Sequence, residues 1–350
     1  MQFYRCKKCL MVSTRPRITF DGNGVCNACQ WHETKKTVDW RNREQTFDAL
    51  CNRFMRASGN DCIVPWSGGK DSIYVAHTLH DYGMNPLLIT IIPHLETEIG
   101  KWNRLNMCPD FDHLMITLEE GRYRREAKKH FLQHGRPKHP WENAISAVIL
   151  QQAVKLDIPF VIYGEEGEQE YGGTSQEADT WMWPVSKEYL TKLYYSGQTV
   201  YKLPRNAEFD SLFFTQWSRF ENWSPSTHAN FAIAKGMRTE PVRHQGTLTT
   251  SSQISDKLQD LHMHLAFLKF GFGRCTADTS IAIRDGWMTR EEAIGWVQSY
   301  EDELPMRYFQ EYLEYFGMSA REYWAALDRH VNLDILKKEH EKWVLREPAF

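Results

Sequence analysis

The feature that most constrains this chain is a glycine-containing loop between an apolar run and a helical pattern. The run Cys62–Val64 leads into the sequence Pro-Trp-Ser-Gly-Gly-Lys-Asp-Ser at 65–72, and apolar residues then recur at helical spacing over 73–79. A strand, a tight turn and a helix start in this order present unbonded backbone N–H groups to a phosphate. Gly68 and Gly69 permit positive φ and a close approach of the backbone to an anion. The sequence therefore predicts an anion-binding turn within an α/β fold.

The side chains of the loop predict the ligand more closely. Ser67 and Ser72 supply hydroxyl donors, and Lys70 supplies a positive charge. Asp71 would repel a phosphate unless a cation lies between them, so we expect it to help hold Mg²⁺ and, with Lys70, to act in catalysis. The spacing is not that of G-x-x-x-x-G-K-[ST]. Ser-Gly-Gly-x-Asp-Ser after a strand instead resembles the PP-loop of the N-type ATP pyrophosphatases, which implies cleavage of ATP to AMP and pyrophosphate. The other interpretation is a glycine turn without a ligand.

Two cysteine pairs near the N-terminus predict a metal site. Cys6 and Cys9 form one C-x-x-C pair, and Cys26 and Cys29 form a second after an interval typical of a zinc ribbon. The turn sequence Asp-Gly-Asn-Gly at 21–24 returns the chain between them. Four thiolates leave no open coordination position, so we expect structural rather than catalytic Zn²⁺. The alternative is four unligated thiols.

Charge and hydropathy exclude other classes of protein. The formal net charge of −3 provides no basic field, so we expect no nucleic-acid partner. No apolar run approaches the roughly 20 residues that span a bilayer. The N-terminus also lacks the apolar segment of a signal peptide. We therefore expect a cytoplasmic protein with no membrane partner.

Strand and helix patterns alternate in the first half of the chain, which predicts a doubly wound parallel α/β sheet. Strands are expected at 62–67, 86–92, 114–118 and 160–163, and helices near 70–82, 96–107, 121–134 and 141–156. The expected domains are a zinc ribbon at 1–35, a linker helix at 36–58, a PP-loop ATP pyrophosphatase domain at 59–175, and a mainly helical substrate or partner region at 176–350.

Ligands of such sheets lie at the carboxyl ends of the strands. This rule brings Thr90 and Ile92, at the end of the second strand, close to the loop at 67–72, and predicts that both bind the nucleotide. The acidic run 164–170 follows the fourth strand, with Glu165 as its first carboxylate. We expect Glu165 to act on the Mg²⁺–pyrophosphate or on the acceptor. The other interpretation of this run is a solvated loop.

A second candidate binding segment lies in the later half of the chain. Arg274, Asp278 and Arg284 fall in a glycine-containing stretch that we expect to bind substrate near the crevice, with ordinary loop chemistry as the alternative. Thr289 and Ser319 each begin a capping-box sequence and predict the start of an amphipathic helix.

Taken together, the cysteine pairs, the PP-loop and later stretches resemble the N-acetyl sugar amidotransferases of bacterial surface-polysaccharide and nonulosonic-acid pathways. The matching stretches are 14–17, 20–29, 97–100 with Asn103, 270–274 and 283–293, and the resemblance is weakest over 175–250. It implies an ATP-dependent conversion of a sugar acetamido group to an acetamidino group, for example in the synthesis of lipopolysaccharide O-antigen. The implied substrate is a nucleotide-linked or free N-acetyl sugar. The implied ammonia source is a separate glutaminase with a cyclase-like channel subunit, with free ammonium as the alternative.

Two rival functions remain. Some PP-loop enzymes thiolate tRNA and also carry zinc knuckles, but thiolation needs further cysteines, and Cys108 and Cys275 are isolated in the sequence. A non-catalytic zinc-ribbon scaffold is the other rival, and the intact loop argues against it. We expect Cys51, Cys62, Cys108 and Cys275 to be small buried residues.

Overall fold

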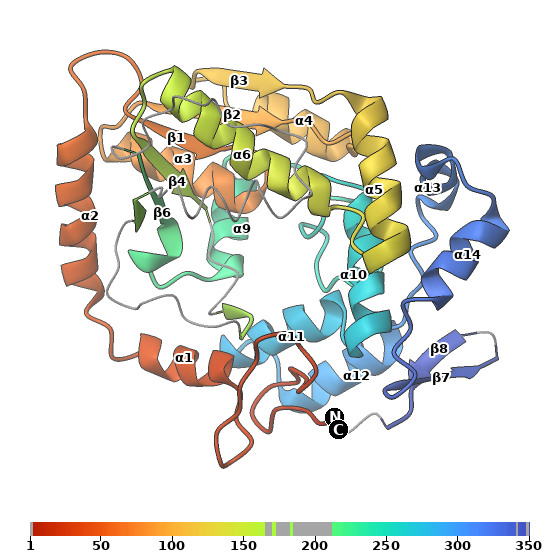
Figure 1. The fold of residues 1–350 in the computed structure, drawn as a ribbon. Coiled ribbons are helices and arrows are strands. Elements are labelled where there is room, and N and C mark those ends of the chain that lie inside the picture. The colour runs from red at the N-terminus through yellow and green to blue at the C-terminus, as the bar shows by residue number, and fades with distance from the viewer. Residues whose placement is uncertain (1–2, 165–169, 173–182, 185–211, 341, 348–349) are drawn as a thin grey trace.

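The computed structural model describes residues 3–164, 170–172, 183–184, 212–340, 342–347 and 350. Its centre is a six-stranded sheet in the order β3-β2-β1-β4-β6-β5 (Figure 1). The strands are β1 (Cys62–Pro65), β2 (Pro86–Ile91), β3 (His113–Ile116), β4 (Phe160–Tyr163), β5 (Trp183–Pro184) and β6 (Phe213–Gln216). All neighbouring pairs are parallel except β5 with β6 at the edge. The predicted doubly wound α/β fold is confirmed.

The sheet extends further along the chain than the sequence indicated. Strand β6 pairs in parallel with β4, from Phe160 opposite Phe213 to Tyr163 opposite Gln216. It therefore adds a strand beyond residue 175, where the alternation of strands and helices was expected to stop. Its sequence, Phe-Phe-Thr-Gln, contains no aliphatic residue, whereas aliphatic residues marked the predicted strands β1, β2, β3 and β4. Strand β1 also ends at Pro65 rather than at residue 67.

The strands have two apolar faces because successive side chains point to opposite sides. Ile63, Ile89 and Val161 face a core formed with α6, whereas Val64 and Leu88 face a core formed with α2, α3 and α9. The helices that cover the sheet are α2 (Trp40–Phe54), α3 (Lys70–Asp81), α4 (Glu98–Asn106), α5 (Glu120–His134), α6 (His139–Lys155) and α9 (Pro225–Ala234). The sheet thus lies between two helical layers (Figure 1).

The later part of the chain forms a helical region beside the sheet. Its elements are α10 (Leu258–Phe270), α11 (Arg274–Arg284), α12 (Arg290–Tyr300), α13 (Phe309–Phe316), α14 (Ala320–Asp328) and the hairpin of β7 (Leu336–Glu339) with β8 (Lys342–Leu345). The short helix η1 (Trp217–Arg219) instead packs with the sheet layer, where the ring centroids of Trp217 and Phe47 of α2 lie 4.8 Å apart. Phe131 of α5 joins the core of α10, α13 and α14. The capping boxes at Thr289 and Ser319 are both present.

The N-terminal segment packs on this helical region. Helix α1 (Asn27–Lys35) follows the second cysteine pair, and the Arg5 guanidinium lies over the ring of Phe350, 4.7 Å from its centroid. Arg5 Nη1 donates to Leu10 O at 2.9 Å and to Thr276 Oγ1 at 3.3 Å. Ser280 Oγ accepts from Leu10 N at 3.2 Å. Helix α11 therefore supports the N-terminal segment.

Across the described residues, no helix has both the length and the apolar character needed to cross a membrane.

Candidate active site

The loop after β1 has the backbone geometry of a phosphate-binding turn. Gly68 has a φ of +71°, and a Cβ placed there would lie 2.4 Å from Arg104 N, so the loop touches the backbone of α4. Gly69 is the N-cap of α3, and its N–H donates to Ser67 Oγ at 3.2 Å. Ser72 Oγ donates to Gly69 O at 3.0 Å. The N–H groups of the first turn of α3 have no acceptor within the helix, so this end of the helix favours an anion.

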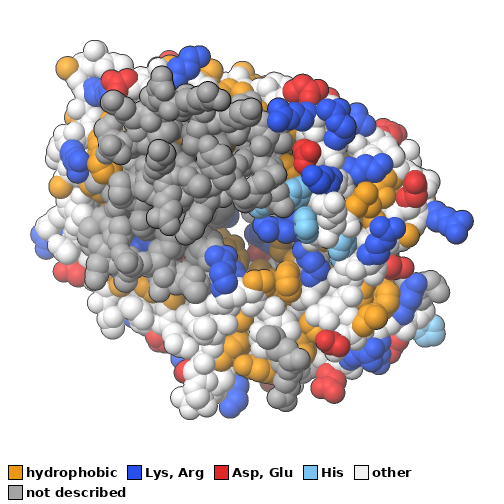
Figure 2. Space-filling view, viewed as in Figure 1, with side chains coloured by type: hydrophobic (Ala, Val, Ile, Leu, Met, Phe, Trp, Pro, Cys, Tyr) orange, Lys and Arg blue, Asp and Glu red, His pale blue; other side chains and the backbone are white. Residues whose placement is uncertain are grey.

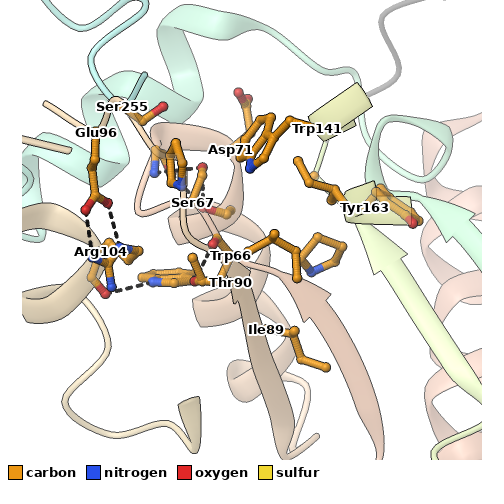
Figure 3. A pocket seen from close by; sticks show the side chains of 17 residues that line it. Trp66, Ser67, Asp71, Ile89, Thr90, Glu96, Arg104, Trp141, Tyr163 and Ser255 are labelled. Carbon is orange, nitrogen blue, oxygen red and sulfur yellow. Dashed lines mark hydrogen bonds and ion pairs between the residues drawn. The ribbon is translucent and has the colours of Figure 1, made fainter. Parts of the chain in front are cut away.

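A cavity of about 260 Å³ adjoins this loop at the carboxyl ends of β1, β2 and β4; we call it the loop cavity. Its walls combine apolar and aromatic side chains with a few polar groups, which is typical of a small-molecule site. The apolar and aromatic residues among them include Trp66, Ile89, Ile91, Pro93, Trp141, Ile145 and Tyr163. In Figure 3, Glu96 and Arg104 lie on one side of Ser67, and Tyr163 lies on the other. An apolar hollow beside a helix N-terminus suits a nucleoside with attached phosphates.

Hydrogen bonds fix the polar wall of the loop cavity (Figure 3). Arg104 forms a bidentate pair with Glu96, with N–O distances of 2.6 and 2.8 Å. Trp66 Nε1 donates to Arg104 O at 3.0 Å, and Thr90 Oγ1 donates to Trp66 O at 2.6 Å. Of the two residues expected to bind the nucleotide, Thr90 lines the cavity, whereas Ile92 does not, and the Ile92 N–H donates to Ile116 O. No motif in the sequence marks Glu96 and Arg104 as residues of this site.

Asp71 lies at the centre of a buried network that the sequence did not reveal. It pairs with Lys70, and its Oδ1 accepts from Trp223 Nε1 at 3.2 Å and lies 2.7 Å from His228 Nδ1. Burial alone would raise the pKa of Asp71, but the Lys70 charge and the His228 hydrogen bond lower it well below its usual range. The carboxyl is therefore ionised at neutral pH.

His228 links Asp71 to a second carboxylate. Its side chain is fully buried, its ring stacks on Tyr74 at 4.0 Å between centroids, and its Nε2 lies 3.5 Å from Glu221 Oε1. Burial lowers the pKa of His228, but bonding to Asp71 and Glu221 raises it overall. His228 thereby holds the Asp71 carboxylate in place. A histidine so far along the chain carries no local signal of this role.

A second, more polar cavity of about 300 Å³, the central cavity, continues from the loop cavity and shares Ser67 and Ser255 with it. Among the described residues, three cationic side chains line it, and each pairs with a carboxylate. The pairs are Lys70 with Asp71, Lys138 with Asp256 at 3.1 Å, and Arg274 with Asp278 at 2.8 Å. In Figure 2 the surface is hollowed near its middle, and Lys and Arg side chains border the hollow. Lys and Arg side chains bind phosphate oxygens as well as carboxylates, so these three cations could bind a polyphosphate chain in place of their carboxylate partners.

A third cavity of about 350 Å³, the outer cavity, shares Lys70, Ser251 and Arg274 with the central one. Arg274 and Asp278, two of the three residues expected to bind substrate, line it. Arg284 lines none of the three cavities, and its Nη2 donates to Glu170 O at 2.5 Å. The predicted catalytic Glu165 lies outside the described residues.

The four N-terminal cysteines converge as predicted. Their sulfur atoms all lie within 4.8 Å of one another, with Cys6 Sγ 3.9 Å from Cys29 Sγ and Cys9 Sγ 3.6 Å from Cys26 Sγ. Tetrahedral Zn²⁺ with bonds of about 2.3 Å requires sulfur atoms about 3.8 Å apart, so the four thiols fit this ion. Backbone N–H groups of Cys26 and Met11 also point at Cys6 Sγ and Cys9 Sγ. Such donors stabilise metal-bound thiolates.

The remaining cysteines are buried, as predicted. Burial raises the pKa of Cys108, whose Sγ donates to Arg104 O at 3.3 Å. Burial also raises the pKa of Cys275 far above its usual range. Neither thiol has the exposure or the low pKa of a reactive cysteine.

Part of the later half of the chain is similar to one known protein family. Residues 215–348 match the family described as LPS biosynthesis protein WbpG-like, C-terminal domain. No curated protein matches the chain.

Two solved structures resemble parts of the fold. One, from Methanocaldococcus jannaschii, is described as a predicted subunit of tRNA methyltransferase, with 16% identity, a TM-score of 0.32, and 59% of this chain and 85% of that one covered. The other is the NH3-dependent NAD synthetase of Campylobacter jejuni in complex with nitrate, with 13% identity, a TM-score of 0.29, and coverage of 59% and 100%.

Proposed function

We propose that this chain is an ATP-dependent amidotransferase that converts the acetamido group of a sugar into an acetamidino group. The observation that carries the proposal is the continuity of the three cavities along the loop at 67–72. The loop and central cavities share Ser67 and Ser255, and the central and outer cavities share Lys70 and Arg274. ATP on one side and an acceptor on the other would meet at the N-terminus of α3.

The walls support this placement of ATP. The base would occupy the apolar part of the loop cavity, and the phosphates would lie against Ser67, Ser72 and the first turn of α3. Lys70 would exchange Asp71 for a phosphate oxygen. Mg²⁺, when bound, would supply further positive charge beside the leaving pyrophosphate, and the ionised Asp71 is its expected ligand.

The proposed reaction has two steps. The acetamido oxygen attacks the α-phosphorus, a P–O bond forms, and the bond to the β-phosphate breaks to release pyrophosphate. Ammonia then adds to the carbon of the adenylated imidate, the C–O bond breaks, and AMP leaves with loss of a proton to give the amidine. Lys70 and the N–H groups at the start of α3 would stabilise the charge that grows on the phosphates.

The match of residues 215–348 to a lipopolysaccharide-biosynthesis family supports a sugar acceptor of the O-antigen or nonulosonic-acid type. We propose that a separate glutaminase with a cyclase-like channel subunit supplies the ammonia. Because the reaction consumes ATP, we place it in the cytoplasm, with neither nucleic acid nor membrane as a partner.

The cysteines favour this function over tRNA thiolation. Sulfur transfer needs a thiolate that reaches the substrate, whereas Cys108 and Cys275 are buried with raised pKa values. The remaining alternative, a scaffold without catalysis, would not require a cavity beside a phosphate-binding turn.

The test is release of pyrophosphate from ATP and Mg²⁺ with ammonium and a panel of acetamido sugars, combined with product mass. We expect release that depends on the acceptor and a product in which NH replaces the carbonyl oxygen. Omission of ammonium, as the control, should prevent that product. Release stimulated by tRNA alone would assign the protein to thiolation, and no release with either substrate would favour the scaffold.

A further inference from the structure

We infer that the outer cavity binds the N-acetylhexosamine unit of the acceptor, with Trp287 as the platform for the sugar ring. This inference rests on the proposed function and assigns its second substrate to a place in the fold. The cavity holds about 350 Å³, which is sufficient for one hexose with its acetamido group.

Trp287 is a large aromatic side chain that is not buried in the core. Its side chain follows α11, is 49% exposed, and lines the outer cavity together with Pro225 and Ile233, of which Ile233 is also exposed at 46%. A pyranose ring carries C–H groups on its faces and hydroxyl groups around its rim. An open aromatic surface with aliphatic neighbours suits such a face.

A run of hydroxyl side chains provides the complementary polar wall. Thr249, Thr250, Ser251 and Ser252 follow one another in the chain, and all four line the cavity. Thr249 Oγ1 lies 3.2 Å from Ser251 Oγ and 3.0 Å from Ser252 Oγ. Hydroxyl groups donate and accept hydrogen bonds, so this chain of hydroxyls can bind the rim of a sugar without adding charge.

The charged groups set the orientation of the sugar. Arg274 and Asp278 lie one turn apart on α11 and pair at 2.8 Å, and Asp278 Oδ2 also accepts from Leu248 N at 3.5 Å. The pair therefore joins α11 to the hydroxyl segment. Lys70 lines both this cavity and the central one. The acetamido oxygen would point towards Lys70, beside which the proposed function places the phosphates of ATP.

The origin of the walls supports this assignment. Apart from Lys70 and Tyr171, every described residue that lines the outer cavity falls within 215–348, the segment that matches the lipopolysaccharide-biosynthesis family. The loop cavity, in contrast, is lined mainly by residues of the sheet domain. The two substrates would thus bind to different parts of the chain.

The experiment is saturation-transfer NMR with the full-length protein, Mg²⁺ and a non-hydrolysable ATP analogue. The probes are UDP-N-acetylglucosamine, UDP-N-acetylgalactosamine, free N-acetylglucosamine, and UMP as the carrier alone. The variants are Trp287→Ala, Trp287→Phe, and Val242→Ala as a control, because Val242 is 60% exposed and lines none of the three cavities. A separate titration of each variant with the ATP analogue, without sugar, reports on the nucleotide site.

We expect saturation of the ring and acetyl protons of an N-acetylhexosamine, and none for UMP. Trp287→Ala should raise the dissociation constant of the sugar at least about tenfold, since truncation of a central aromatic anchor commonly costs this much. Trp287→Phe should restore part of the affinity, and Val242→Ala should leave it unchanged.

The outcomes separate the inference from the proposed function. Binding of the ATP analogue without binding of any acetylated sugar would overturn the inference alone. Sugar binding that is unaffected by Trp287→Ala would do the same. Failure of the ATP analogue to bind to wild-type protein would overturn the proposed function, whatever the sugars do.

Discussion

The close approach of Gly68 to helix α4 yields a prediction that separates steric contact from backbone strain. Gly68 and Gly59 both have positive φ, at +71° and +79°. A Cβ at Gly68 would lie 2.4 Å from Arg104 N and 2.8 Å from Asn103 C, whereas a Cβ at Gly59 meets nothing within 4 Å. Gly59→Ala is therefore a matched control for Gly68→Ala.

The expected magnitudes follow from these two contributions. A left-handed conformation costs a non-glycine residue about 1–2 kcal/mol, and this cost applies to both variants. Insertion of a methyl group into packed backbone costs a further ~1–3 kcal/mol, and this cost applies only at Gly68. We therefore expect Gly68→Ala to be less stable than Gly59→Ala by about 1–3 kcal/mol. A shift of the loop by about 1 Å should also slow adenylation about 100-fold.

Urea unfolding of the two variants and of the wild type measures the stability difference, and pyrophosphate release measures the catalytic effect. Equal loss of stability in both variants would show that a methyl group at residue 68 does not clash with the backbone of α4. Wild-type turnover in folded Gly68→Ala protein would show that adenylation by ATP does not depend on the geometry of this turn.

Three further predictions follow from the site and the core. Asp71→Asn should lower pyrophosphate release at least about 100-fold while the protein stays folded, because the ionised carboxylate is lost; turnover like that of the wild type would exclude Asp71 from the mechanism. Cys26→Ala should lower the zinc content and the melting temperature, and full zinc occupancy in folded variant protein, measured by metal analysis, would contradict the four-thiolate site. His264 is buried, and burial lowers its pKa from 6.5 to about 4, so the native state excludes a proton that the unfolded chain binds. Its contribution to stability is present above pH 6.5 and is lost as the pH falls towards 4, by about 2 kcal/mol at pH 5. Urea unfolding at pH 7 and pH 5 should therefore show a smaller pH effect in His264→Gln than in the wild type, and equal effects would contradict the low pKa.

Local sequence patterns predicted the elements that depend on local physics. The buried strands, the turn at 67–72 and the capping boxes at Thr289 and Ser319 each carry their signal within a few residues. Strand β6 was missed because Phe-Phe-Thr-Gln lacks the aliphatic residues of the predicted strands, and it takes its identity from pairing with β4, which lies far away in the sequence.

The residues of the site also fall into two groups: those marked by a short sequence motif and those that only the folded structure brings to the site. The phosphate-binding loop and the four cysteines are short motifs with a defined chemistry. Arg104, His228 and Ser255 reach the site only because α4, α9 and the segment before α10 pack around the loop. A buried histidine and a paired arginine are common in cores, so no pattern at these positions distinguishes them.

The contact between helix α11 and the N-terminal segment can form only late in the synthesis of the chain. Arg274, Asp278 and Ile281 recur along one face and line the outer cavity, while Thr276 and Ser280 on another face hold the N-terminal segment. Arg5 and Thr276 are 271 residues apart. At about 5–20 residues per second, a ribosome needs roughly 14–54 s to make that length of chain. During this time helix α11, on which the cysteine segment packs, has not yet been made, and metal binding can already order the segment. The cysteine segment can therefore take its place against α11 only after Thr276 and Ser280 have been synthesised.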